Sequence, residues 1–224
     1  MREVELEVFD DAALAAETAA GWIVEAVDEG GHIGLSGGSS TRPAHERVAV
    51  LRPDWSRVEL WWVDDRCVPP DDGRSNYRTI RESLLDGLAR PPASVHRIRG
   101  EHGPEEAAAE YDAALDGVML GFALLGIGPD GHTASLFPNA PTLNETERRA
   151  VAVEAGFEPF VPRVTMTRPA LAAAGTMVYL ATGEAKAEAV ERAFAQPPSP
   201  ETPAILVRGQ RTIAVLDRPA ASRL

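Results

Sequence analysis

The sequence has a single cysteine, Cys67, and no long apolar run. One cysteine excludes an intramolecular disulfide bond and a cluster of cysteines around a metal ion. No stretch approaches the roughly 20 consecutive apolar residues that a membrane-spanning helix needs. The first residues, Met1–Glu7, also lack the apolar segment of a secretory signal peptide. These absences predict a cytoplasmic protein that does not associate with membranes.

Positive charge is also scarce. The chain has 22 Lys and Arg residues against 34 Asp and Glu residues, and its formal net charge is −12 at pH 7. Such a chain repels nucleic acids and anionic membranes over most of its surface. An anionic ligand must therefore be held by a local group of donors, so each Arg or Lys near a glycine-rich loop is a candidate binding residue.

Hydrophobic residues make up 44% of the 224 residues, as is typical of a globular protein. No linker rich in Pro, Gly, Ser or charge divides the chain, so residues 1–224 are predicted to form a single domain. Strand patterns alternate with helix patterns, which predicts an α/β fold with a largely parallel sheet and helices on both faces. The predicted strands are residues 4–8, 32–36, 58–63, 122–125, 151–153, 164–166, 176–181, 205–207 and 213–216. The predicted helices are residues 11–28 with Asp10 as cap, 41–51, 76–88 with Ser75 or Asn76 as cap, 105–115 and 184–195.

Four polar segments follow predicted strands: residues 36–40, 64–66, 128–132 and 183–186. In open α/β sheets, ligands bind beyond the carboxyl ends of the strands. We therefore expect the four segments to form one pocket.

The first segment, Ser36–Thr41 (SGGSST), lies between a strand and a helix. Its glycines let backbone N–H groups approach a ligand, and the helix start adds partial positive charge, as in a phosphate-binding loop. An ordinary strand-to-helix turn is an equally good interpretation of this segment alone. A third interpretation is a nucleophile elbow, because Gly34–Gly38 (GLSGG) matches G-x-S-x-G. The elbow is disfavoured because only one strand precedes it and no upstream loop could supply an oxyanion hole.

The third segment contains Gly126-x-Gly128-x-x-Gly131, a match to the dinucleotide fingerprint. That fingerprint requires a full helix after the last glycine, and Pro138 and Pro141 leave at most one or two turns. No nucleotide or other cofactor is therefore predicted.

His132 is the predicted catalytic residue, because imidazole can take a proton from water and return it to a leaving group near neutral pH. Asp130 or Asp64 could fix its tautomer. The other histidines are expected to be structural or exposed. The acidic residues around Asp64 could suggest a metal site, but Arg66 lies among them and would repel a cation. No metal is predicted.

Five segments together resemble 6-phosphogluconolactonases, within the glucosamine-6-phosphate isomerase/6-phosphogluconolactonase family, over nearly the full chain. The segments are Leu35–Pro43 (LSGGSSTRP), Trp62–Tyr77 (WVDDRCVPPDDGRSNY), Gly126–Pro138 (GIGPDGHTASLFP), Arg163–Leu171 (RVTMTRPAL) and Gly183–Ala187 (GEAKA). The third is the most specific of the five. The family usually has Glu where this chain has Asp65 and often an aromatic residue where it has Cys67.

The resemblance implies the fold of sugar-phosphate isomerases and deaminases. It also implies hydrolysis of 6-phosphogluconolactone to 6-phosphogluconate in the oxidative pentose phosphate pathway, with functional coupling to glucose-6-phosphate dehydrogenase. The implied roles are a phosphate site, a general base at His132, and an acidic-basic segment, Asp64 with Arg66, that lines the site. The implied phosphate-binding residues are Gly37, Gly38, Ser39, Ser40, Arg163 and Lys186.

Two alternatives share this fold. In the pattern of glucosamine-6-phosphate deaminases a Glu follows the histidine by five residues, and here that position is Phe137. A non-catalytic sugar-phosphate-binding protein would need the phosphate loop but not both His132 and Arg66. The lactonase is therefore the favoured prediction.

Overall fold

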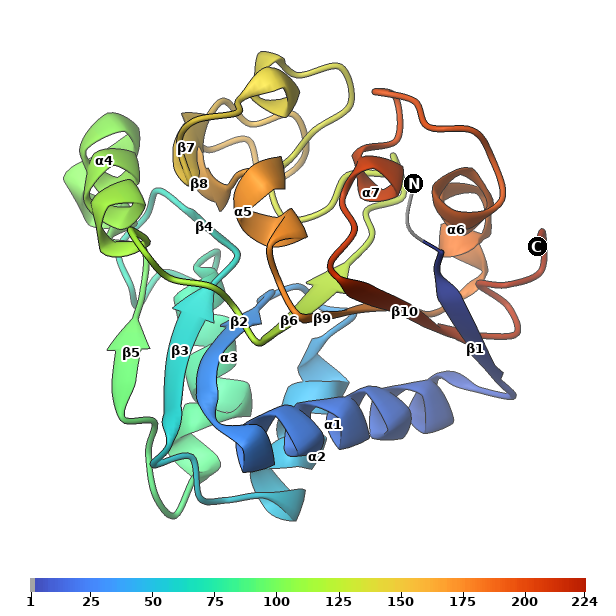
Figure 1. Cartoon of the computed structure of the whole chain (residues 1–224), viewed down its shortest axis with the longest axis horizontal. Helices are drawn as coiled ribbons and strands as arrows, with labels where there is room; N and C mark the ends of the chain where they lie inside the picture. Colours follow the sequence, from blue (N-terminus) through green and yellow to red (C-terminus); the bar gives the residue numbers. More distant parts are fainter. Residues whose placement is uncertain (1–2) are drawn as a thin grey trace.

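The computed structural model describes residues 3–224 and contains a seven-stranded, wholly parallel sheet, in the order β1-β10-β9-β6-β2-β3-β5 (Figure 1). The strands are β1 (Glu5–Phe9), β2 (Gly31–Leu35), β3 (Val58–Trp62), β5 (Ser94–His96), β6 (Phe122–Gly126), β9 (Thr176–Ala181) and β10 (Arg211–Asp217). A small antiparallel sheet, β4-β8-β7, consists of β4 (Asp64–Arg66), β8 (Arg163–Met166) and β7 (Ala150–Val153). The predicted α/β class with a largely parallel sheet is confirmed.

Helices cover the sheet on both sides. In Figure 1, α1 and α2 lie below the sheet, and α4, α5, α7 and the small sheet lie above it. The helices are α1 (Ala12–Glu29), α2 (Arg42–Leu51), α3 (Asn76–Ser83), α4 (Pro104–Ala114), α5 (Arg168–Ala172), α6 (Ala187–Phe194) and α7 (Pro203–Leu206). Short 3₁₀ turns are η1 (Leu85–Gly87), η2 (Gly100–His102), η3 (Pro141–Asn144) and η4 (Glu184–Lys186). None of the helices in residues 3–224 is both long enough and apolar enough to span a bilayer.

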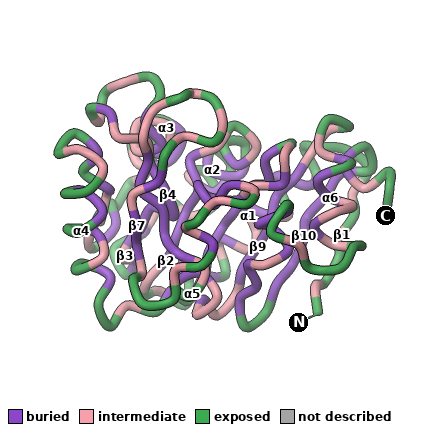
Figure 2. Tube along the Cα trace, turned by 90° about the horizontal axis from the view of Figure 1, so that it is seen from above, coloured by how far each residue is buried: buried purple, intermediate pink, exposed green. Residues whose placement is uncertain are grey.

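The central strands are apolar along their length because layers cover both of their faces. In β9, Met177–Ala181 is buried throughout, and Figure 2 shows buried residues running through the middle of the sheet. The edge strand β1 differs, since the exposed fractions of Leu6 and Val8 are 46% and 48%. Successive side chains of a strand point to opposite faces, so both faces of β1 are partly open to solvent, with Leu6 and Val8 on one and Glu5 on the other.

Three expectations from the sequence are corrected. The cap of α1 is Asp11 and not Asp10, because the Asp11 side chain accepts a hydrogen bond from the Leu14 N–H at 2.9 Å. Residues 205–207 do not form a strand: Ile205 and Leu206 end the short helix α7, which Pro203 begins because its fixed φ suits the first helical position. The helix predicted to reach residue 88 leaves helical geometry at Leu84, where φ is −135°.

His45 lies on α2, fully buried, with its Nδ1 atom 3.4 Å from the Ser83 hydroxyl. Burial lowers the pKa of His45 to about 3, and the charge of Arg42 acts in the same direction. The unfolded chain takes up this proton near the ordinary pKa of 6.5, so the folded state loses stability as the pH falls from about 6.5 toward 3.

Replacing His45 with glutamine should remove this acid sensitivity. Between pH 7 and pH 5, the free energy of unfolding should fall by about 2 kcal/mol more in the parent protein than in His45→Gln. Urea unfolding of both proteins across this range measures the difference, and the contributions of unchanged groups cancel. Parallel pH curves for the two proteins would contradict the buried neutral imidazole.

Candidate active site

A cavity of about 240 Å³ lies beyond the carboxyl ends of β2, β3, β6 and β9. All four polar segments that the sequence predicted to converge contribute residues to it. The residues lining it are Ser36, Gly38–Thr41, Asp64, Arg66, Asn76, Gly126–Pro129, His132, Ala134, Phe157, Glu158, Arg163 and Lys186. The cavity is therefore the candidate active site.

The loop after β2 presents Gly38, Ser39 and Ser40 to the cavity just before α2 begins. The Thr41 hydroxyl fixes its shape by donating to the carbonyl of Ser36 at 2.7 Å and of Gly38 at 2.9 Å. Gly37 lies beside α3 instead, and a Cβ there would meet the Asn76 Cβ at 2.6 Å. Only glycine therefore lets α3 pack this closely against the loop.

Asp64 and Arg66 reach the cavity from β4, and Asn76 links them. Asp64 is buried and accepts hydrogen bonds from the Ser135 hydroxyl at 2.5 Å and from Asn76 Nδ2 at 3.2 Å. Asn76 Oδ1 accepts in turn from Arg66 Nη1 at 2.7 Å. Asp64 thus anchors the amide that orients the Arg66 guanidinium. The sequence suggested Asn76 only as a helix cap, and that cap is Ser75.

Asp65 does not line the cavity, and its carboxylate binds backbone N–H groups instead. Its carboxylate accepts from the N–H groups of Arg66, Asn76 and Tyr77 at 2.7, 2.6 and 2.9 Å. Burial raises the pKa of Asp65 to about 6, although these three donors act in the opposite direction. The family usually has Glu at this position, and the shorter Asp65 side chain still accepts hydrogen bonds from three backbone N–H groups.

His132 is held by Asp130 and packs against two aromatic rings. Its Nδ1 atom lies 2.6 Å from Asp130 Oδ1, which also accepts from the His132 backbone N–H at 3.1 Å. Burial alone would raise the pKa of Asp130, but the hydrogen bonds and charge of His132 offset it, so that pKa is lowered. Gly128 is required here, because a Cβ would lie 2.1 Å from His132 Nδ1.

An ionised Asp130 can only accept a hydrogen bond, so the hydrogen-bond network assigns the proton of the neutral imidazole to Nδ1. The lone pair of Nε2 is then available at the cavity.

The ring centroids of Phe137 and Phe157 lie 5.2 and 5.3 Å from that of His132. Sequence reasoning missed Phe157, because no motif marks a residue in an irregular loop.

Three cationic side chains line the cavity: Arg66, Arg163 and Lys186. Arg66 and Arg163 lie directly opposite each other in the β4–β8 pair. Like charges at such a position repel, and an anion between them relieves the repulsion. Lys186, in η4, is half-buried and is the only lysine in the sequence. Burial lowers the pKa of Lys186, and the charge of Asp130 opposes this effect.

Arg163 is nearly fully buried, with 2% exposed, and most of its hydrogen bonding is internal. Nη2 donates to the carbonyl oxygens of Phe157, Glu158 and Pro159 at 2.6, 3.1 and 3.2 Å. Burial lowers the pKa of this guanidinium. Its Nε atom is buried and has no hydrogen-bond partner among the described residues.

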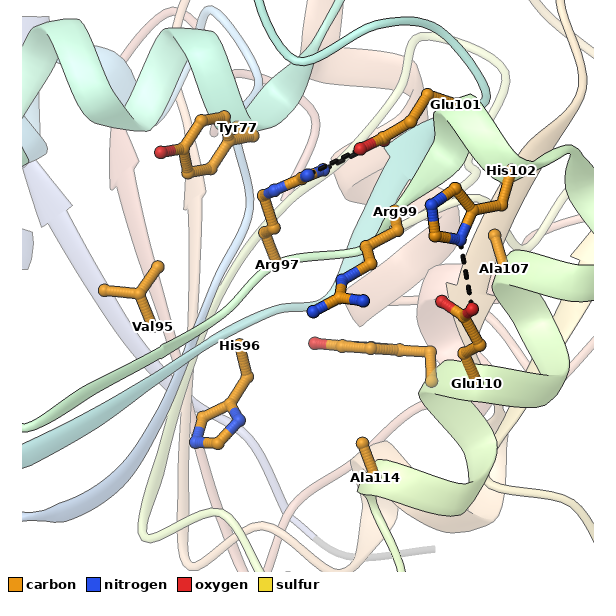
Figure 3. Close-up of a pocket in the computed structure, with 11 residues that line it drawn as sticks. Tyr77, Val95, His96, Arg97, Arg99, Glu101, His102, Ala107, Glu110 and Ala114 are labelled. Carbon is orange, nitrogen blue, oxygen red and sulfur yellow. Dashed lines mark hydrogen bonds and ion pairs between the residues drawn. The ribbon is translucent and has the colours of Figure 1, made fainter.

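A second cavity, of about 770 Å³, lies near α4 and β5 and contains none of the predicted site residues (Figure 3). Its charged side chains are mostly paired, Arg97 with Glu101 and His102 with Glu110. His102, Glu106 and Glu110 form the one group among residues 3–224 whose ligand atoms could meet at a metal ion. All three are exposed, and none belongs to the candidate active site.

The fold and the cavity define a parallel α/β protein with a glycine-serine loop and a histidine–aspartate pair at the strand ends. The model of the family "Glucosamine-6-phosphate isomerases/6-phosphogluconolactonase" matches residues 10–215, and the chain belongs to that family. A curated 6-phosphogluconolactonase of Streptomyces coelicolor is 38% identical over 207 residues, which cover 85% of this chain and 77% of the relative.

Solved structures agree with this assignment. A 6-phosphogluconolactonase from Thermotoga maritima superposes with a TM-score of 0.86 and 26% identity, covering 96% of this chain and all of the other. A monomeric glucosamine-6-phosphate deaminase has a TM-score of 0.88 at 18% identity, covering 99% of this chain and all of the other. At that identity the deaminase shows a shared fold alone.

Proposed function

We propose that this protein hydrolyses 6-phosphogluconolactone to 6-phosphogluconate. The observation that carries the proposal is the His132–Asp130 pair, which faces the same cavity as a glycine-serine loop and three cationic side chains. The named relatives are 6-phosphogluconolactonases, which supports the same reaction. Functional coupling to glucose-6-phosphate dehydrogenase stays a prediction.

The phosphate group of the lactone binds at Gly38–Ser40, where backbone N–H groups and hydroxyls lie at the start of α2. Arg163 and Lys186 supply positive charge, and charge-assisted hydrogen bonds to phosphate are among the stronger ones in proteins. Local charge of this kind is needed because the protein as a whole carries −12.

Hydrolysis needs a base, an oxyanion partner and an acid. Nε2 of His132 takes a proton from a water molecule that attacks the lactone carbonyl, while Asp130 holds the opposite nitrogen. Arg66, oriented by Asn76, stabilises the negative charge that develops on the carbonyl oxygen. The imidazolium then returns the proton to the ring oxygen as the ester C–O bond breaks. No covalent intermediate or metal is required.

Phe137 argues against the deaminase alternative. A ring-opening carboxylate in that position would face His132, and here a phenyl ring packs against the imidazole at 5.2 Å. The ring cannot move a proton. His132 therefore has no carboxylate at residue 137 to assist ring opening, and lactone hydrolysis does not need one.

Purified protein should release acid from freshly made 6-phosphogluconolactone well above the spontaneous rate, and release no ammonia from glucosamine 6-phosphate. His132→Ala should lower kcat by roughly 10²–10⁴, the usual contribution of a positioned acid–base group. A pH-stat assay and an ammonia assay measure the two reactions. Ammonia release, or phosphate-ester binding without acid release, would reverse the assignment.

Lys186→Met should raise KM for the phosphorylated lactone more than it lowers kcat, because a contact far from the reacting carbonyl binds ground state and transition state alike. The loss in kcat/KM should be roughly 10–100-fold. Turnover of unphosphorylated gluconolactone should hardly change, and Lys186→Arg is the matched control that keeps the charge. Equal losses on both lactones would exclude Lys186 from the phosphate site.

A further inference from the structure

Arg163 contacts both phenylalanines whose rings pack against the imidazole of His132: the ring of Phe137 and the backbone of Phe157. Its guanidinium carbon lies 5.1 Å from the ring centroid of Phe137. Its Nη2 atom donates to the carbonyl oxygen of Phe157 at 2.6 Å and to those of the next two residues. One buried side chain thus joins the Phe137 ring to the loop that carries the Phe157 ring.

We propose that Arg163 is a positioning residue for the reaction, which acts on His132 through Phe157. The inference rests on the proposed lactonase function and adds a role that phosphate binding does not require. By fixing three consecutive carbonyl groups, Arg163 holds the 157–159 backbone where the Phe157 ring packs against the imidazole. Phe137 packs against the same imidazole, and the two rings limit its rotation.

The sequence of the loop around Phe157 allows the contact between the Phe157 ring and His132. Gly156 lies next to Phe137, and a Cβ at residue 156 would lie 2.7 Å from the Phe137 ring carbon Cγ. Glycine therefore allows the backbone to approach Phe137 closely enough for the next residue to reach His132. Phe160, three residues further along the same loop, is 71% exposed.

The residue type matters as well. The Arg163 guanidinium is planar, so it can lie over the Phe137 ring while an edge nitrogen bonds the carbonyl groups. A lysine ammonium is a point charge without that fixed plane. Arg163→Lys therefore keeps the charge at the cavity but loses the geometry that joins the two rings.

Two effects on catalysis follow. Restricted rotation keeps Nε2 pointing at the substrate carbonyl, and a small misplacement of a catalytic group is costly. The phenyl rings also cover part of the imidazole, whose side chain is 15% exposed, and a hydrogen bond in a less polar environment is stronger. Both effects act on the chemical step, so they do not depend on the substrate's phosphate.

The test compares Arg163→Lys, Phe157→Leu and Phe157→Tyr with the parent protein on phosphorylated and unphosphorylated gluconolactone. Arg163→Lys and Phe157→Leu should lower kcat by roughly 10–100-fold on both lactones. Phe157→Tyr should restore most of the rate, because it keeps the ring. Phe160→Leu, a change in the same loop at an exposed position, should leave kcat unchanged.

Proton NMR supplies a readout that a merely structural role would not move. The ring protons of His132, assigned by their absence in His132→Ala, should lose the ring-current shift of Phe157 in both Arg163→Lys and Phe157→Leu. An unmoved His132 signal, with loss confined to KM for the phosphorylated lactone, would assign Arg163 to phosphate binding alone and overturn the proposal. Phe157→Leu tests the same idea without removing a buried charge, so a misfolded Arg163 variant would not leave it undecided. Failure of the parent protein to hydrolyse either lactone would instead refute the proposed function.

Discussion

The hydrogen bond between His132 Nδ1 and Asp130 Oδ1, at 2.6 Å, is the interaction on which the rest of the site depends. Nδ1 is hydrogen-bonded to the protein, and Nε2 remains free to accept a proton in the proposed reaction. The local sequence is shaped around it: Gly128 leaves room for the imidazole, and the positive φ of 92° at Gly131 turns the chain between Asp130 and His132. The loop after β6 thus holds one imidazole in a fixed position at the end of a buried strand.

Three cationic side chains lie near this imidazole, although the net charge of the protein is negative. A protein with a net charge of −12 gathers Arg66, Arg163 and its only lysine in one small cavity. Arg66 and Arg163 lie opposite each other across β4 and β8, where like charges repel, and the proposed phosphate would offset this repulsion. The small antiparallel sheet therefore places these two cationic residues at opposite positions of one strand pair.

The large sheet and the meeting of four polar segments could be predicted from the sequence, because both follow from short-range pattern and one topological rule. The continuous apolar run at Thr176–Ala181 is a clear example. Asn76 and Phe157 could not be predicted, because their roles arise from contacts between segments far apart in the chain. β4 was missed for a related reason: Asp-Asp-Arg has no strand pattern, and its pairing with β8 forms the strand. The roles given to Gly37–Ser40, Arg163 and Lys186 in phosphate binding stay predictions.

The account depends most on which nitrogen of His132 carries the proton. Nitrogen-15 NMR of the imidazole, in protein at a pH where the ring is neutral, reads this directly from the two ring-nitrogen shifts. The account predicts a protonated Nδ1 and an unprotonated Nε2, and in Asp130→Asn a loss of that preference together with the rate of lactone hydrolysis. A protonated Nε2 in the parent protein would contradict it, because the nitrogen at the cavity would then have no lone pair to accept a proton from water.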